Sequence, residues 1–294
     1  MRRRDLVAVM GWGAATALSG CATAGGRADV TGGVGPGLER VRDAFLRAHV
    51  NDPGGAQLAV YRHGRRIVDL WTGVDPVKRQ PFTADSVTTT MSCTKGWTAL
   101  VAHDLAQRGV IDLDAPVARY WPAYAQNGKG DTTVAWLLSH RAGLPHFPRE
   151  AGISWPEMAD WARCVRVLEQ MTPAWKPGTA VLYHAVTYGF LVGEVIRRAS
   201  GRTVGEIIAQ DYARPLGLDL WIGNLPEAAE DRYAPQFTLP LDGPKTAVDF
   251  LNSRAAHLSE QPAANGIASA RAMAKLYAAA IGQVDRVRIL RDDT

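Results

Sequence analysis

The amino-acid sequence predicts an α/β fold of the α+β kind, with antiparallel strands and several helices around a large core. Two segments rich in β-branched and aromatic residues, Gln57–Tyr61 and Arg66–Trp71, flank a four-residue turn and predict a β-hairpin. Helical periodicity recurs along the chain. With 294 residues, 47% of them hydrophobic, the chain can fill one or two domains. Because two strands do not form a stable sheet alone, we expect further strands from later in the chain.

The first residues are typical of an export signal. Arg2–Arg4 precede an apolar stretch that is too short to span a bilayer, so residues 1–20 are predicted to be a signal peptide. The paired arginines also resemble a twin-arginine export signal. Small residues before Cys21 resemble a lipobox and predict lipidation of that thiol, hence a periplasmic or cell-envelope lipoprotein. A plain signal peptide with an incidental cysteine is the alternative. Residues 21–37, rich in glycine, are predicted to be a flexible tether.

The helices are predicted from apolar periodicity and from residues that begin or end helices. Residues 37–49 carry Leu38, Val41, Phe45 and Leu46 on one face. The remaining predicted helices run from Ser92 to Gly109, after Thr132 or Thr133, from Ser154 to Met171, from just after Tyr183 to Gly201, and around Ser269–Ala280.

The stretch around Ser92 carries the first chemical signal. Ser92 precedes Lys95 by three residues at the predicted start of a helix, so the two side chains lie on one face. A buried lysine with a lowered pKa can take the proton of a serine hydroxyl and make it a nucleophile. A helix-capping serine and a solvated lysine would give the same spacing. The nearly uncharged run around Lys95 favours the catalytic interpretation, because a merely solvated lysine is out of place there.

Other potential chemistry is weaker. Tyr183 directly precedes a long apolar helix, where a tyrosine is usually a packing residue. His140 and His146 are six residues apart without an acidic or cysteine partner, so we interpret them as structural and predict no metal site. Cys93 and Cys164 could pair in an exported protein, but Cys93 is more simply a buried thiol.

Composition excludes some functions. The net charge of +4 is modest and no basic stripe appears, so we expect no nucleic-acid partner. The absence of a Gly-x-Ser-x-Gly motif argues against an α/β-hydrolase.

Taken together, Ser92-Cys93-Thr94-Lys95 and Tyr183 resemble the Ser-x-x-Lys motif and the tyrosine of the Tyr-x-Asn motif in the serine β-lactamase-like superfamily of class C β-lactamases, DD-peptidases and family VIII carboxylesterases. Supporting segments are 137–145, 215–223 and 264–277. The resemblance implies one serine hydrolase domain over 38–294, an antiparallel sheet flanked by helices plus a mostly helical subdomain, and no cofactor. It implies an acyl-enzyme on Ser92, with Lys95 and Tyr183 transferring protons.

Two departures from the family pattern bear on function. Ala185 replaces the asparagine whose amide contacts an amide substrate, which favours the esterase branch. We therefore expect a carboxylesterase acting on a small ester. The alternatives are a β-lactamase or DD-peptidase acting on cell-wall peptides, and a catalytically inactive envelope lipoprotein that binds a ligand. A third motif of the Lys-Thr-Gly type is not recognisable, since Lys245-Thr246-Ala247 precedes the segment that should come before it.

This departure also leads to an expectation about the chain as it stands. The family's remaining sheet strands should follow Thr294, so the C-terminal strands are expected to be missing and the domain incomplete. We then expect an exposed apolar sheet face, an open strand edge and one missing oxyanion donor, and therefore weak or absent activity.

Overall fold

The computed structural model describes residues 30–239 and 246–294. The strands are β1 Thr31–Val34, β2 Ala56–Arg62, β3 Arg65–Thr72, β4 Val74–Asp75, β5 Gln80–Pro81, β6 Thr88–Thr89, β7 Leu220–Ile222 and β8 Gly266–Ala268. The α-helices are α1 Glu39–His49, α2 Thr94–Gln107, α3 Val134–Leu138, α4 Trp161–Gln170, α5 Thr187–Ser200, α6 Val204–Ile207, α7 Arg214–Leu216, α8 Glu227–Glu230, α9 Thr246–Leu251, α10 Arg254–Leu258 and α11 Ala270–Ile281.

The predicted hairpin is confirmed as β2 and β3, which pair antiparallel with Leu58 opposite Leu70. Its turn residues His63 and Gly64 both have positive φ, 48° and 75°, which suits the twist of a two-residue hairpin loop. The third strand of this sheet is β1, in the order β1-β3-β2. The expectation that the hairpin's partners come from later in the chain is therefore wrong for this sheet. Residues 31–34 of the predicted tether form a strand, because their backbone pairs along β3.

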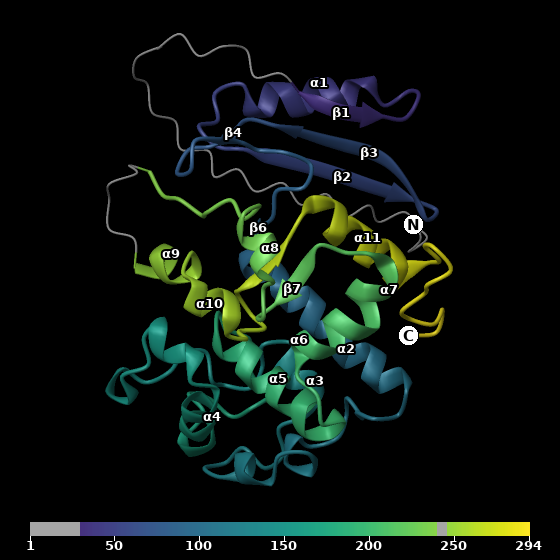
Figure 1. The fold of residues 1–294 in the computed structure, drawn as a ribbon. Helices are drawn as coiled ribbons and strands as arrows, with labels where there is room; N and C mark the ends of the chain where they lie inside the picture. Colours follow the sequence, from purple (N-terminus) through teal and green to yellow (C-terminus); the bar gives the residue numbers. More distant parts are fainter. Residues whose placement is uncertain (1–29, 240–245) are drawn as a thin grey trace.

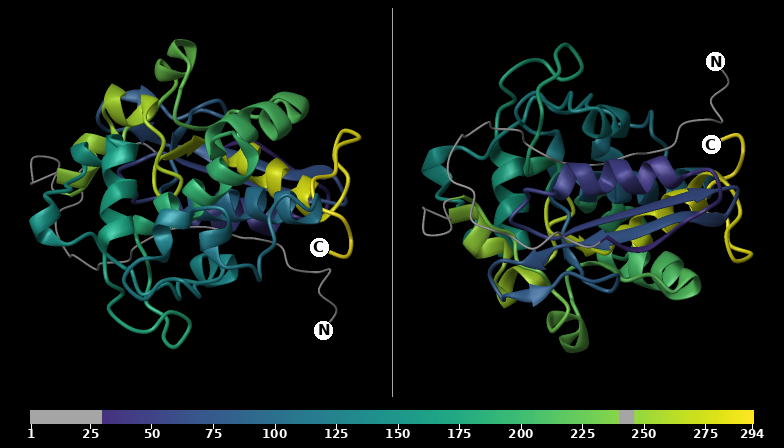
Figure 2. Two further views of the ribbon diagram at one scale, coloured as in Figure 1. Left: turned by 90° about the horizontal axis from the view of Figure 1, so that it is seen from below. Right: turned by 90° about the horizontal axis from the view of Figure 1, so that it is seen from above.

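The two faces of the β1-β3-β2 sheet are covered by different helices (Figures 1 and 2). The apolar side chains of Leu58, Val60, Val68 and Leu70 form one cluster with the apolar face of α1, including Phe45. The opposite face lies against α11, near the C-terminal end of the chain. In the described residues α1 covers the apolar face that was expected to be exposed: Val68 and Leu70 are buried, and Leu58 and Val60 of the edge strand β2 are half-buried.

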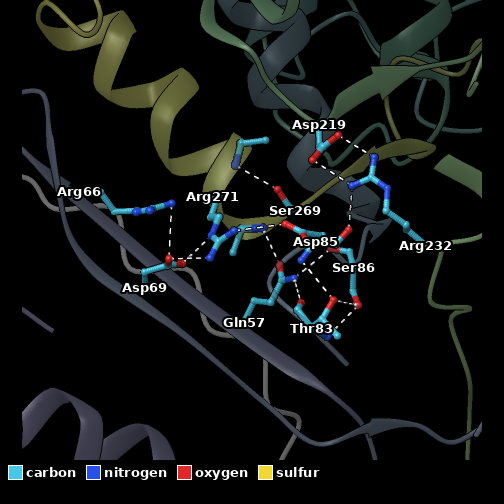
Figure 3. Close-up of polar contacts among 12 residues, drawn as sticks. Gln57, Arg66, Asp69, Thr83, Asp85, Ser86, Asp219, Arg232, Ser269 and Arg271 are labelled. Atoms are coloured by element: carbon cyan, nitrogen blue, oxygen red, sulfur yellow. Dashed lines mark hydrogen bonds and ion pairs between the residues drawn. The ribbon is translucent and has the colours of Figure 1, made fainter. Parts of the chain in front are cut away.

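Polar contacts attach α11 and the chain leading to Ser92 to the sheet (Figure 3). The side-chain nitrogen of Gln57, on β2, donates to the carbonyls of Thr83 and Ser86, at 2.6 and 2.9 Å. The side-chain oxygen of Gln57 accepts from the backbone amide of Ala270, at 2.8 Å. Arg271 of α11 forms a forked pair with Asp69 of β3, at 2.8 and 2.7 Å. These contacts fix the loop from which the chain enters β6 and then Ser92.

The body below the sheet is mainly helical, and α2 and α5 form its centre. The α2 side chains Trp97, Val101 and Leu105 are buried in the same core as most of α5. Because α5 is apolar on nearly all sides, it is covered by other elements along most of its length. It ends where predicted, with Gly201 in the left-handed conformation. No helix in the two described ranges is long and apolar enough to cross a bilayer.

Two predicted helices differ in detail. Thr133, one of the two predicted caps, accepts a hydrogen bond from the amide of Trp136 and begins α3. The continuous helix predicted from Ser154 to Met171 is instead a short 3₁₀ turn, Pro156–Ala159, followed by α4. Asp160 separates them because its backbone angles are not helical and its side chain caps the α4 N-terminus.

Candidate active site

Ser92 lies on a sharp turn between a small sheet and α2. The small sheet has the order β6-β8-β7, and the chain leaves β6 three residues before Ser92. Met91 adopts a left-handed φ of 48°, and Met91–Cys93 form a 3₁₀ turn that leads directly into α2. The sequence predicts Ser92 in the first turn of the α-helix. In the structure Ser92 lies in the 3₁₀ turn that comes just before the α-helix. Its side chain is exposed, so a substrate can reach it.

The small sheet holds this turn in place. Gly266 of β8 accepts hydrogen bonds at its carbonyl from the Thr90 amide, at 2.7 Å, and from the Thr90 hydroxyl, at 2.9 Å. Its own amide donates to the hydroxyl of Thr94, at 2.9 Å. The first hydrogen bond within the 3₁₀ turn is donated by the Cys93 amide to the Thr90 carbonyl. The Ser92 amide precedes that bond, so the turn leaves it available to an anionic oxygen.

Lys95 lies beneath Ser92 and is buried, with 7% of its surface exposed. Its Nζ is 3.1 Å from the Ser92 Oγ. It also donates to two backbone carbonyls, of Ala185 at 2.7 Å and of Ala263 at 2.9 Å. Burial lowers the pKa of Lys95, and the neighbouring Tyr183 opposes that shift. The sequence-based expectation of a buried lysine beside Ser92 is confirmed.

Tyr183 lies on the other side of Ser92. It comes from the segment before α5, 91 residues later in the chain, and its hydroxyl donates to the Ser92 Oγ at 2.6 Å. The Lys95 Nζ lies 4.9 Å from the centre of the Tyr183 ring. The structure thus brings all three predicted catalytic residues together. Cys21, the predicted lipidation site, lies outside the described residues.

The three groups can share protons in two equivalent ways. The amine of Lys95 gives two hydrogens to the Ala185 and Ala263 carbonyls, so its remaining tetrahedral position faces Ser92. With neutral lysine, the Ser92 hydrogen points at the lysine lone pair and Tyr183 donates to Ser92. With charged lysine, the extra proton has come from Tyr183, so the lysine donates to Ser92 and Ser92 donates to the phenolate oxygen of the tyrosine. In both arrangements the serine hydrogen faces a base, which is what an activated nucleophile requires.

His140 packs beside the catalytic residues, although the sequence analysis did not place it there. Its ring centre lies 4.9 Å from that of Tyr183 and 5.0 Å from that of Tyr188. Its Nδ1 accepts from the His184 amide at 3.1 Å, so that nitrogen carries no hydrogen. Burial, with His184 and Lys95 nearby, lowers the pKa of His140 to about 4. His140 is therefore a neutral support for the tyrosine, and its position in the sequence carries no signal for this.

The other candidate groups do not take part in the hydrogen bonds that join Ser92, Lys95 and Tyr183. Cys93 follows Ser92 in the same turn and is half-buried, whereas the sequence predicted a buried thiol. Cys93 and Cys164 are both thiols, and burial raises the pKa of each. Within residues 30–239 and 246–294, no three His, Cys, Asp or Glu side chains are grouped so that they could hold a metal ion. Lys245 of the rejected third motif lies outside the described residues.

Known proteins share this architecture. Among curated proteins, the chain is 36% identical over 270 residues to the esterase/β-lactamase LipL of Mycobacterium tuberculosis, covering 81% of this chain and 61% of LipL. It is 31% identical over 185 residues to a β-lactamase of Escherichia coli, covering 62% of this chain and 46% of that protein. It therefore spans about three fifths of LipL's length and less than half of the E. coli protein's.

Solved structures agree with these similarities. A family VIII carboxylesterase superimposes with a TM-score of 0.79 at 37% identity, covering 89% of this chain and 74% of that one. A penicillin-binding protein homologue from Caulobacter crescentus gives a TM-score of 0.77 at 37% identity, covering 90% and 75%. The model of the family described as Beta-lactamase matches residues 43–293. The chain therefore belongs to the β-lactamase family, and it has that family's mixed fold of helices and antiparallel sheets.

Proposed function

We propose that this protein is a serine hydrolase that cleaves carboxylic esters through an acyl-enzyme on Ser92. The observation that carries the proposal is the hydrogen-bonded line from Tyr183 through Ser92 to the buried Lys95. The names of similar proteins, an esterase/β-lactamase and a family VIII carboxylesterase, support the same reaction class.

In the proposed reaction, the Ser92 Oγ attacks the ester carbonyl carbon while its proton passes to Lys95. The Ser92 amide donates to the carbonyl oxygen as that oxygen becomes negative. The bond to the alcohol then breaks, and the alkoxide receives a proton through the Tyr183 hydroxyl, which lies at the attacking oxygen. Water then attacks the resulting Ser92 ester and gives a proton to the Tyr183 oxygen. Lys95 returns its proton to the departing Ser92 Oγ, which releases the carboxylic acid and restores the serine.

Ala185 favours esters over amides and β-lactams. Its backbone carbonyl is occupied by Lys95, and its side chain is a methyl group without a donor or acceptor. An amide group buried against that methyl would lose a hydrogen bond, at a cost of about 1–3 kcal/mol. This corresponds to roughly ten- to hundredfold in rate, enough to decide between substrate classes.

Side-by-side kinetics test this preference. With the full-length protein, kcat/KM for p-nitrophenyl butyrate is expected to exceed that for nitrocefin by at least about tenfold. The matched variant Ala185→Asn restores an amide at the same place and should narrow the ratio by raising nitrocefin turnover. Nitrocefin turnover equal to ester turnover in the unchanged protein would instead favour the β-lactamase alternative.

We further propose, from the sequence of residues 1–37 alone, that the protein is exported and anchored by a lipid on Cys21. Labelled palmitate should enter the protein in a bacterial host, and Cys21→Ser should release it from the membrane fraction, because a single thioether carries the anchor. A matched change at another thiol, Cys164→Ser, should leave the label in place. An unlabelled protein recovered in the soluble fraction would mean an ordinary signal peptide.

A further inference from the structure

The segment Gln261–Asn265 supplies one of the two carbonyls that hold Lys95. It is buried throughout, and the Ala263 carbonyl lies 2.9 Å from the Lys95 Nζ. It comes from a part of the chain 168 residues away from the lysine. Any shift of this segment would therefore move the acceptor that directs the lysine amine.

Thr98 ties this segment to the helix that carries Lys95. It lies on α2 one turn beyond the lysine and is fully buried. Its hydroxyl is 2.6 Å from the carbonyl of Pro262, the residue before Ala263, and 3.2 Å from the Thr94 carbonyl within its own helix. The hydroxyl has one hydrogen, and the shorter contact assigns it to Pro262. One helix thus carries both the lysine and the group that fixes the lysine's acceptor.

Asn265 closes the same segment from its other end. Its side-chain oxygen accepts from the Gln261 amide at 2.9 Å, and its side-chain nitrogen donates to the carbonyls of Ala256 and Ser259 at 2.8 and 2.7 Å. The Gln261 carbonyl accepts the amides of Ala263, Ala264 and Asn265. The segment is a closed turn that α2 holds through the Thr98 hydroxyl, besides Lys95 itself at Ala263 and the Thr94 hydroxyl at Gly266, directly after the turn.

We infer that Thr98 is a positioning residue for the proton transfer at Ser92: it holds the turn closed by Asn265 so that the Ala263 carbonyl directs the Lys95 amine at the serine oxygen. The inference rests on the proposed function, because it concerns the base of that reaction. No contact of Thr98 with substrate is involved. Gly266, directly after the turn, has its own hydrogen bonds to Thr90 and Thr94 beside Ser92, so a loosened turn would chiefly misdirect the lysine.

The expected effect is on the rate of chemistry. Displacements of the order of 1 Å in a catalytic group typically cost about a hundredfold in rate. Thr98→Val keeps the shape of the side chain, removes the hydroxyl and leaves the Pro262 carbonyl without its donor. We expect kcat to fall about ten- to hundredfold with KM changed less than about threefold, since the substrate contacts remain. Thr98→Ser retains the hydroxyl and should recover most of the loss.

The pH profile separates this role from a general loosening of the fold. A carbonyl accepts a stronger hydrogen bond from charged than from neutral lysine, so weakening the Ala263 contact lowers the pKa of Lys95. The acid limb of kcat/KM should move to lower pH. Water entering a loosened site would move it upward, because hydration favours the charged form. The other groups facing Lys95 are Tyr183, His140, with a pKa near 4, and Tyr188, whose pKa burial raises.

The test measures kcat, KM and the acid limb for p-nitrophenyl butyrate in the full-length protein and in the two Thr98 variants. The control is Thr132→Val, which removes a hydroxyl from a fully buried threonine in the loop before α3 and should leave all three quantities unchanged. Each of three results would overturn the inference: a normal kcat in Thr98→Val, a kcat in Thr98→Ser as low as in Thr98→Val, or a shift of the acid limb of kcat/KM to higher pH. Ser92→Ala in the same assay tests the proposed function separately: retained activity there would remove the Ser92 mechanism, whereas an inactive Ser92→Ala beside a normal Thr98→Val would overturn the Thr98 inference alone.

Discussion

Ser92→Ala is expected to lower kcat for p-nitrophenyl butyrate in the full-length protein by at least about 10³, and to prevent labelling by an active-site phosphonate. The serine oxygen forms the covalent bond, so no neighbouring group can replace it. Lys95→Met should cost a similar factor, because it removes the amine and residues that act as a unit lose their effect together. Both variants should remain folded, since Ser92 is exposed and methionine fits the space of the lysine stem. Lys95→Met also leaves the Ala185 and Ala263 carbonyls without a donor, so it should lower thermal stability about as much as the control below.

A second buried lysine provides the matched control for Lys95. Lys129 is fully buried and donates to the backbone carbonyls of Glu169 and Met171, away from Ser92. Lys129→Met leaves these carbonyls without a donor and should lower thermal stability while kcat per folded molecule stays normal. Active-site titration with the phosphonate and a melting curve distinguish the two effects. Full turnover in Ser92→Ala would remove the proposed mechanism, and neither turnover nor labelling in the unchanged protein would favour the binding-lipoprotein alternative.

Gly266→Ala is expected to be the most damaging change outside the three reacting side chains. A Cβ at this position would lie 2.3 Å from the Trp97 ring and 2.6 Å from the Thr94 hydroxyl, and both belong to α2. Because Trp97 is fully buried, its ring has little room to move. Strand β8 must then separate from the turn that carries Ser92. Overpacking of this kind costs about 1–3 kcal/mol or more, so we expect a melting temperature several degrees lower.

The same displacement should lower kcat, because Gly266 also holds Thr90 two residues before the nucleophile. Gly130→Ala is the control: its nearest neighbour, the Ala125 carbonyl oxygen, lies 3.8 Å from the added carbon. That variant should match the unchanged protein in melting temperature and in kcat. A Gly266→Ala protein with normal stability and turnover would show that β8 does not fix the nucleophile turn.

Local patterns in the sequence predicted the elements that depend on local forces. The hairpin followed from two segments rich in β-branched and aromatic residues on either side of a turn, and the burial of Lys95 followed from its uncharged neighbours. Gly201 ended its helix where predicted, because a left-handed residue is favoured there. The proximity of Tyr183 to Ser92 did not follow from spacing. It came from the family resemblance, since no local pattern connects residues 91 positions apart.

The features that were missed depend on contacts between distant segments. Strand β1 has glycine-rich composition typical of a flexible segment, and it is ordered only because β3 offers a paired edge. The two lysine acceptors are backbone carbonyls, which every residue possesses, so no residue type at 185 or 263 could indicate them. His140 belongs to the site through ring packing against Tyr183, and a histidine in a loop is equally compatible with a structural role.

The lysine acceptors also bear on how this family can change its substrates over evolutionary time. Since the amine is held by the main chain at Ala185 and Ala263, the side chains at these positions can mutate while the base keeps its orientation. Position 185 can then exchange an amide-binding side chain for a methyl group in a single step, with the proton chemistry at Ser92 intact. On the proposed function, a substitution at position 185 would therefore change which acyl compounds bind while the main-chain acceptors keep the lysine amine directed at Ser92.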